Sequence, residues 1–271
     1  MAATPIIFCA DDFGLNRPVN NGILALARQG RLSATSCMTT GAAFASDAPA
    51  LAELTIGKGL HLNLTEAETG TRIALPLREL IRRCYLHNID VAQLRTGIEA
   101  QCDAFEQAFG AAPDYVDGHQ HVHQLPVVRE QLLQILQRRY GRHKPWLRST
   151  RAPRGIAPFG DRFKAWIIET LGSRELYRQA RNAGFRSSRH LLGVYDFSGD
   201  AARYLQKLDA WLAKAARGDV LMCHPASGAE RDDPIGAQRE VEFAALSGPA
   251  LTALLAKRHA RIASDATGIG R

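Results

Sequence analysis

The stretch Ile6-Ile7-Phe8-Cys9-Ala10-Asp11-Asp12-Phe13-Gly14 joins an apolar run to two consecutive aspartates. The apolar run predicts a buried strand over residues 5–10, with both carboxylates at its carboxyl end. Adjacent carboxylates repel each other, so this arrangement is unfavourable unless the charges have a function. A bound metal ion and a proton-transfer role would explain it, with one carboxylate as a ligand and the other as a base. The alternative is a helix cap beside a surface charge.

Histidines recur near the ends of later strand-like runs. Leucines alternate with polar residues in the segment 59–64, so His61 and Asn63 share one face of the expected strand. A polar row inside a parallel sheet needs partners, which favours a site lining over a satisfied core histidine. His224 follows another short apolar run, and near a metal site it would suit a general acid.

The segment 117–123 carries one carboxylate and three imidazoles, from Asp117, His119, His121 and His123. If the segment is extended, alternation places all four side chains on one face. Imidazoles and carboxylates grouped in this way are typical of a metal site, whereas the alternative is a polar loop. Alternate strand residues are about 7 Å apart, so one ion cannot bind them all unless the backbone curls. We therefore expect one histidine to be a ligand and the others to support the site or contact the substrate.

Strand-like runs alternate with amphipathic segments along the chain. Residues 91–109 have helical spacing, Asn16 suits a helix cap, and residues 194–197 suggest a short strand. The alternation predicts a parallel sheet with crossover helices, and the candidate residues lie at the carboxyl ends of its strands. A doubly wound sheet would place them similarly. The length of 271 residues favours a distorted, TIM-barrel-like (β/α) barrel, with a single domain over residues 1–271.

The composition is typical of a soluble globular protein, with 46% hydrophobic and 23% charged residues. No apolar stretch approaches the ~20 residues that span a membrane, and the N-terminus lacks the features of a signal peptide. Five scattered cysteines argue against a disulfide framework or a thiolate zinc site. We therefore expect a cytoplasmic protein without a membrane span.

The net charge of +7 is concentrated in two basic stretches, at residues 138–154 and 174–189. Such stretches attract anionic partners, or they form a solvated, arginine-rich surface. Neither stretch has the aromatic interleaving or the motif of a nucleic-acid module, so we expect no nucleic-acid partner.

Four segments of the chain together resemble the YdjC-type carbohydrate deacetylase family, which includes chitooligosaccharide deacetylases. The resemblance covers residues 5 to about 250, and the four segments occur in the order of the family. They are Ala10-Asp11-Asp12-Phe13-Gly14-Leu15-Asn16, Gly59-Leu60-His61-Leu62-Asn63-Leu64-Thr65-Glu66, Asp117-Gly118-His119-Gln120-His121-Val122-His123-Gln124-Leu125-Pro126 and Met222-Cys223-His224-Pro225.

The resemblance implies a distorted β/α barrel that removes an acetyl group from an N-acetylated sugar with the help of one divalent metal ion. Magnesium or zinc is the usual ion of the family. By the matching motifs, the metal ligands would be Asp12, His61 and His119. Asp11 would then be the general base and His224 the general acid.

Four further residues are predicted to bind the substrate: Arg148, Asn63, His121 and His123. Arg148 stands where the family often places an arginine that steadies the base carboxylate. One carboxylate and two imidazoles would accept magnesium, manganese, zinc or cobalt, so the sequence leaves the ion open.

Two other functions remain possible from the sequence. One is hydrolysis of another acylated amide, such as a lipid-linked, hopanoid-type sugar. The other is a catalytically silent, basic barrel that binds glycans or nucleic acid, although a silent binder does not need two aspartates and a set of histidines. The expected partner is a small oligosaccharide, and relatives often form homodimers.

Overall fold

The computed structural model describes residues 2–66, 73–141, 143–153, 155 and 159–264. These residues form a sheet of eight strands, and every strand pair is parallel. The strands are β1 (Thr4–Phe13), β2 (Ala34–Cys37), β3 (Gly57–Leu62), β4 (Tyr115–Gly118), β5 (Trp146–Leu147), β6 (Leu191–Leu192), β7 (Val220–Cys223) and β8 (Ala260–Ile262).

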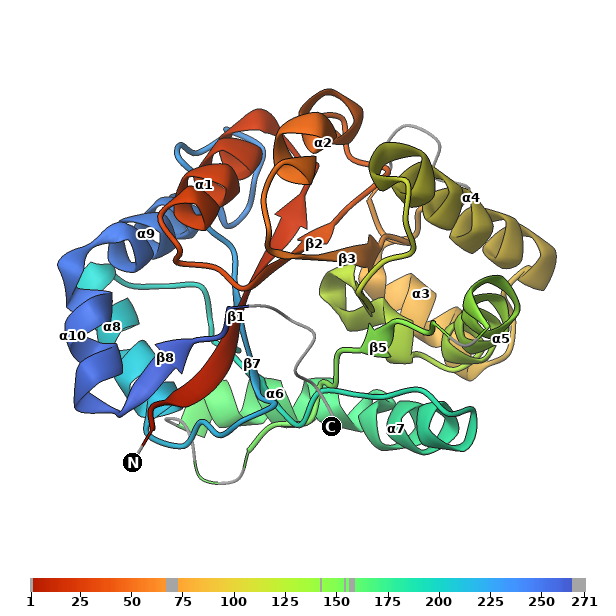
Figure 1. Cartoon of the computed structure of the whole chain (residues 1–271). Helices are drawn as coiled ribbons and strands as arrows, with labels where there is room; N and C mark the ends of the chain where they lie inside the picture. Colours follow the sequence, from red (N-terminus) through yellow and green to blue (C-terminus); the bar gives the residue numbers. More distant parts are fainter. Residues whose placement is uncertain (1, 67–72, 142, 154, 156–158, 265–271) are drawn as a thin grey trace.

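The sheet curls into a distorted barrel with the strand order β5-β4-β3-β2-β1-β7-β6. β8 pairs only with the first residues of β1, from Thr4 to Ile6. The two ends of the sheet meet, because Leu147 of β5 forms a parallel bridge with Ser187, four residues before β6. Figure 1 shows the strands curling with the helices on the outside. The predicted α/β barrel is therefore confirmed.

Helices connect the strands and cover the outer face of the sheet. None of the helices in the described part of the chain is both long and apolar enough to cross a bilayer. They are α1 (Arg17–Arg28), α2 (Phe44–Ala52), α3 (Leu77–Tyr85), α4 (Val91–Phe109), the 3-10 segment η1 (His119–Gln124), α5 (Val128–Tyr140), α6 (Phe159–Thr170), α7 (Ser173–Asn182), α8 (Ala201–Leu212), α9 (Gly236–Ser247) and α10 (Pro249–Lys257).

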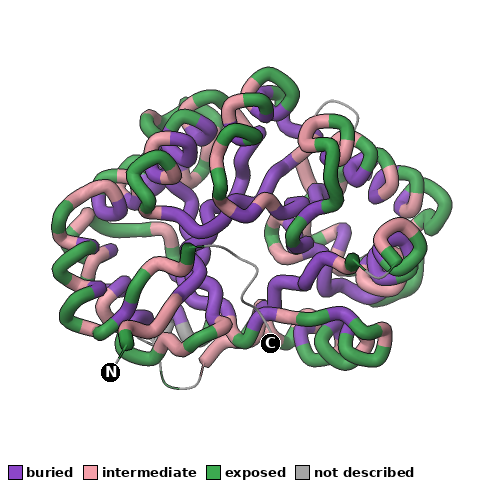
Figure 2. The backbone as a smooth tube through the Cα atoms, in the orientation of Figure 1, coloured by how far each residue is buried: buried purple, intermediate pink, exposed green. Residues whose placement is uncertain are grey.

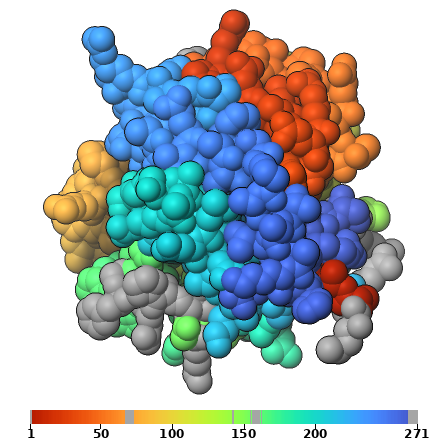
Figure 3. All heavy atoms as spheres, turned by 90° about the vertical axis from the view of Figure 1, so that its left-hand side faces the viewer, coloured from red at the N-terminus to blue at the C-terminus, as the bar shows by residue number. Residues whose placement is uncertain are grey.

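Helix α1 and the helices near the C-terminus meet on one side of the barrel. α9 packs against α1, and Figure 3 shows blue segments from the C-terminal part of the chain beside the red N-terminal segments. Because of this contact, residues more than 200 positions apart in the sequence can reach the same strand end.

Alternation along the strands separates an outer core from an inner one. Ile6 and Phe8 pack outward against the helices, whereas Cys9 points inward with Tyr115 and Trp146. Figure 2 shows the burial that results, with purple strands inside and green helix surfaces outside. The same alternation directs the polar residues near the strand ends into the barrel. These are Asp11, His61, Asp117, Arg148 and His224.

Several local predictions agree with the structure. The expected strand at residues 5–10 lies within β1, and the expected helix at residues 91–109 is α4. Asn16 caps α1, because its side chain accepts a hydrogen bond from the backbone N–H of Val19 at 2.9 Å. Capping of this kind satisfies one of the free N–H groups of the first helical turn.

The strand predicted at residues 194–197 is wrong. The structure places β6 at Leu191–Leu192, and the chain turns at Gly193 with a φ of 91°. A Cβ on Gly193 would lie 2.1 Å from the carbonyl oxygen of Met222, so the backbone passes too close to β7 for a regular strand. Helix α3 has no counterpart among the predicted elements, because its sequence LRELIRRCY buries only Leu80 and Cys84.

The inner core generates a test of the fold. A Cβ on Gly59 would lie 2.3 Å from the ring of Tyr115, which stacks on Trp146 with ring centroids 4.4 Å apart. Because both rings are buried, we expect Gly59→Ala to lower the free energy of unfolding by about 1–3 kcal/mol in urea denaturation. Gly228→Ala is the control, since no atom lies within 4 Å of its added Cβ. Equal stability of the two variants would contradict this packing.

Candidate active site

Both consecutive aspartates face the interior because β1 contains an irregularity at this point. Its register with β2 shifts between Ala10 and Phe13, and Asp12 adopts a φ of 71°. A regular strand sends neighbouring side chains to opposite faces, whereas a bulge can redirect one of them. Aspartate adopts positive φ more readily than most residues. Asp11 and Asp12 are each only 1% exposed, so two carboxylates are buried side by side.

Asp12 forms a compact cluster with two imidazoles. Its Oδ1 lies 3.2 Å from Nε2 of His61 and 3.0 Å from Nδ1 of His119. One ligand atom from each of the three residues lies within 4.8 Å of the others. The second ring nitrogens face other carboxylates, with His61 Nδ1 at 2.6 Å from Asp117 and His119 Nε2 at 3.5 Å from Glu66. Imidazoles oriented by carboxylates in this way are typical metal ligands, so the cluster fits a divalent cation.

Protons on the imidazoles can also balance the negative charge of the carboxylates in this cluster. Burial alone would lower the pKa of His61, but the carboxylates of Asp117 and Asp11 raise it to about 10. Burial also opposes protonation of His119, yet Asp12 raises the pKa of this imidazole. Burial alone would raise the pKa of Asp12, but Arg239 and His119 hold it well below its usual range. At neutral pH, a cation must therefore compete with protons on the histidines.

Arg148 pairs with Asp11 through two hydrogen bonds. Its Nη1 and Nη2 donate to Oδ1 and Oδ2 of Asp11 at 2.5 and 2.7 Å. Nη1 also lies 3.0 Å from Oδ2 of Asp117, to which Ser36 donates a hydrogen bond at 2.6 Å. The Arg148 side chain is fully buried, and a buried charge needs partners of this quality. Asp11 is thus balanced by a guanidinium, separately from the cluster around Asp12.

His224 lies on the other side of Asp11, directly after β7. Its Nε2 is 3.9 Å from Oδ2 of Asp11, and the ring of Phe197 meets the imidazole edge-on at 5.1 Å. The backbone N–H of His224 donates to Oε2 of Glu242 at 2.6 Å. Burial lowers the pKa of His224 to about 4, although the nearby aspartates act in the opposite direction. The imidazole is therefore neutral at neutral pH.

The histidine segment curls instead of extending. Gln120 and His121 have φ values of 51° and 61°, so η1 is a tight turn. Of the three histidines in this segment, only His119 takes part in the cluster around Asp12. The curl therefore separates the imidazoles, which the alternation of an extended strand would have placed on one face.

The remaining predicted residues surround the cluster. Nε2 of His123 donates to the carbonyl oxygen of Arg148 at 3.0 Å, and Nδ1 of His121 is buried with no partner among the described residues. Asn63 is fully buried, and its amide donates to Thr40 Oγ1 at 2.9 Å while its oxygen accepts from the N–H of Thr65. Contact of these side chains with a substrate stays a prediction.

Two buried charged residues were absent from the predicted site: Arg239 and Glu242. Asp117 was grouped with the three histidines of its segment, but no role of its own was predicted for it. Arg239 donates from Nη2 to Oδ2 of Asp12 at 2.7 Å and from Nε to Asp233 at 2.6 Å. Nothing in the sequence distinguishes Arg239 or Glu242, because charged residues on a helix usually face solvent.

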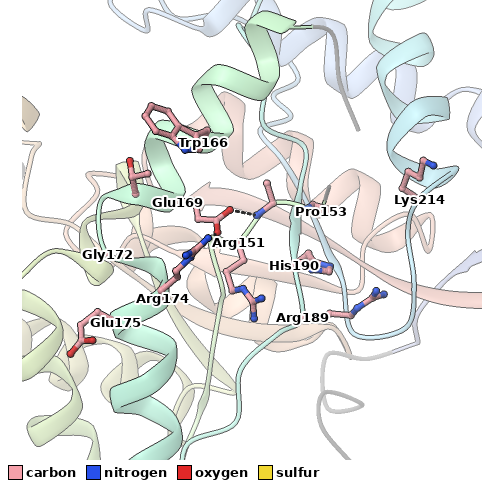
Figure 4. A pocket seen from close by; sticks show the side chains of 12 residues that line it. Arg151, Pro153, Trp166, Glu169, Gly172, Arg174, Glu175, Arg189, His190 and Lys214 are labelled. Carbon is pink, nitrogen blue, oxygen red and sulfur yellow. Dashed lines mark hydrogen bonds and ion pairs between the residues drawn. The ribbon is translucent and has the colours of Figure 1, made fainter. Parts of the chain in front are cut away.

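A separate pocket of about 890 Å³ lies beside α6 and α7 (Figure 4). Arg151, Arg174 and Arg189 line it, which brings the two basic stretches together. Its charge is partly compensated, because Arg174 lies 3.6 Å from Glu169 and Arg189 lies 3.7 Å from Asp219. None of the predicted site residues lines this pocket.

Other arginines of the basic stretches are also paired. Arg139 reaches three carboxylates of α4, and Arg178 pairs with Glu175 at 2.5 Å. Arg142 and Arg154 lie outside the described residues. These contacts favour an arginine-rich, ion-paired surface over a binding site for an anionic partner.

Fold and site together define a class of protein: a curled, parallel α/β barrel with an Asp–His–His cluster, a candidate cation site, beside a buried Asp–Arg pair. The chain belongs to the family described as YdjC-like protein, and the family model matches residues 5–257.

Named relatives agree with this membership. A chitooligosaccharide deacetylase of Enterobacter sp. (strain 638) is 27% identical in an alignment that covers 96% of this chain and 97% of the relative. A carbohydrate deacetylase of Homo sapiens is 33% identical, over 83% of this chain and 67% of the relative. Both relatives are named as deacetylases.

Solved structures share the fold. A provisionally assigned cellobiose-phosphate cleavage protein from Enterococcus faecalis V583 matches with a TM-score of 0.70 and 21% identity, over 97% of both chains. A peptidoglycan N-acetylglucosamine deacetylase matches with a TM-score of 0.53 and 12% identity, over 99% of this chain and 91% of that chain.

The raised pKa values of the two histidines predict that a metal ion displaces protons on binding. Because His61 and His119 must give up their protons, we expect the affinity for Zn²⁺ to rise about tenfold per pH unit for each proton displaced. Isothermal titration calorimetry at pH 6, 7 and 8, in buffers of different ionisation enthalpy, measures both the affinity and the proton release. An affinity that does not change with pH would show that the imidazoles are not ligands.

Proposed function

We propose that the protein is a metal-dependent hydrolase that removes acetyl groups from N-acetylated sugars, such as chitooligosaccharides. The observation that carries this proposal is the convergence of Asp12, His61 and His119 beside a second carboxylate, Asp11, that belongs to a different pair. The names of the relatives support the substrate class.

Asp12, His61 and His119 would hold the ion. A bound divalent ion polarises an amide carbonyl and lowers the pKa of a water molecule. Two imidazoles and one carboxylate suit zinc better than magnesium, which prefers oxygen ligands. The remaining chemistry falls to side chains of the chain itself.

Asp11 acts as the general base. It accepts a proton from water while the water oxygen forms a bond to the acetyl carbonyl carbon. Arg148 donates one hydrogen bond to each oxygen of Asp11, which leaves further lone pairs available on both. The guanidinium thereby fixes the orientation of the base.

His224 acts as the general acid on the amine leaving group. The C–N bond breaks as His224 protonates the nitrogen, and the products are acetate and a free amine. Because His224 is neutral at neutral pH, it must first receive the proton that Asp11 accepted. The separation of 3.9 Å between Nε2 and Oδ2 of Asp11 is short enough for one bridging water or a small side-chain movement.

The polar residues around the cluster would contact the sugar. His121 and His123 are the strongest candidates, because the Nδ1 atom of each has no partner among the described residues. Asn63 and Arg148 are engaged by the protein, so they would act on the substrate mainly by shaping the site. Assembly as a homodimer stays a prediction.

Acetate release tests the proposed function. Chitobiose and chitotriose should be deacetylated by the protein as purified, should resist the chelator-treated protein, and should be turned over again after Zn²⁺ or Mg²⁺ is restored. A panel that adds O-acetylated and lipid-linked acetylated sugars separates the alternative substrates. Full activity after complete metal removal would disprove the mechanism.

The two aspartates should differ in a measurable way. Asp11→Asn removes the base, so we expect kcat to fall about 100-fold or more while the metal content stays near that of the wild type. Asp12→Asn removes a ligand, so metal content and activity should fall together. Elemental analysis and acetate assays on both variants decide the matter. Equal loss of metal in the two variants would contradict this division of roles.

A further inference from the structure

The two oxygens of Asp12 have different surroundings. Oδ1 faces the imidazoles of His61 and His119, whereas Oδ2 accepts a hydrogen bond from Nη2 of Arg239 at 2.7 Å. The terminal torsion of an aspartate is broad and roughly two-fold, so a free carboxylate exchanges its oxygens easily. The contact with Arg239 removes this freedom by fixing one oxygen outside the cluster.

Arg239 is itself fixed from a second direction. Its Nε donates to Oδ2 of Asp233 at 2.6 Å, and its side chain is only 3% exposed. Its backbone carbonyl accepts from the N–H of Ala226, two residues after His224. A buried arginine with two carboxylate partners has little room to move, because breaking either contact leaves a buried charge unpaired.

We propose that Arg239 is a positioning residue for the metal site: it holds Asp12 so that only Oδ1 is presented to the cation. This inference rests on the proposed metal site. Asp233 completes the arrangement by holding the guanidinium, and it thereby ties the segment after His224 to the carboxylate that binds the ion.

Arg239 could position Asp12 or only balance its charge, and the two roles predict opposite changes in metal affinity when Arg239 is lost. If Arg239 only neutralises Asp12, its loss removes a positive charge near the cation and should strengthen metal binding. If Arg239 positions the carboxylate, its loss should weaken binding, because partners that orient metal ligands contribute about 10- to 100-fold in affinity. The sign of the change therefore distinguishes the two roles.

The test measures Zn²⁺ affinity by competition with a chromogenic chelator, on protein stripped of metal. Arg239→Lys keeps the charge but cannot reach both carboxylates with a planar fork. Arg239→Gln removes the charge. We expect both variants to bind Zn²⁺ about 10- to 100-fold more weakly than the wild type. Circular dichroism and thermal melting show whether each variant is folded.

Arg258→Lys is the matched control, because Arg258 donates two hydrogen bonds to Asp209 at 2.8 Å, on the outer helices. This variant should bind Zn²⁺ with the affinity of the wild type. A second readout is the visible spectrum of the protein loaded with Co²⁺, which reports the ligand arrangement. The spectrum should change in Arg239→Lys and not in Arg258→Lys.

The outcomes separate this inference from the proposed function. Failure of the wild type to bind Zn²⁺, or binding unaffected by His61→Ala, would refute the metal site itself. Binding that requires His61 but is unchanged or stronger in Arg239→Lys and Arg239→Gln, with an unchanged Co²⁺ spectrum, would refute only the role of Arg239.

Discussion

Three carboxylates are buried where strands β1 and β4 end, and their neutralisation governs the rest of the site. Asp11, Asp12 and Asp117 are each at most 1% exposed. An unpaired carboxylate in such a place would be strongly unfavourable, so each needs a cation. Arg148 balances Asp11 and Asp117, and Arg239 contacts Asp12. Arg148 follows β5 and Arg239 belongs to α9, so Asp11 and Asp12 are paired by residues that lie far from them in the sequence.

The pairing also explains why two neighbouring aspartates have different chemistry. Cys9, Asp11 and Asp117 place donor atoms as close together as the cluster around Asp12 does. Arg148 already supplies the positive charge among them, which leaves no reason for a metal ion there. The cluster around Asp12 also has a guanidinium, from Arg239, but it adds two imidazoles, whose positive charge depends on protons and can be replaced by that of a cation. The charge of Asp11 is therefore always balanced by Arg148, whereas protons and a cation can replace each other in the cluster around Asp12.

The sequence revealed the parts of the site that depend on local pattern. Apolar runs ending in polar residues located Asp11, Asp12 and His61, because parallel strands bring their carboxyl ends to one edge of a barrel. The preference for a single histidine ligand in the segment 117–123 followed from the spacing of an extended strand. The segment curls instead, and of its three histidines the structure places only His119 in the cluster.

Contacts between residues far apart in the sequence could not be predicted from the sequence. Arg239 lies 227 positions from Asp12 and belongs to a helix, where nothing in the local pattern separates a buried arginine from a solvated one. The positive φ of Asp12, which brings both aspartates to one side, depends on the pairing of β1 with β2. Residues 194–197 looked like a strand, but the close approach of Gly193 to β7 overrode that preference.

Helix α9 connects the two halves of the proposed reaction. Arg239 and Glu242 are three residues apart, so they lie on the same face of the helix. Arg239 holds the carboxylate of Asp12, while Glu242 accepts a hydrogen bond from the backbone N–H of His224. Burial raises the pKa of Glu242 to about 7, although Tyr195 and the backbone of His224 donate hydrogen bonds to it. A displacement of α9 would therefore move Asp12, the proposed metal ligand, together with His224, the proposed general acid. This helix thus fixes the positions of both residues relative to Asp11.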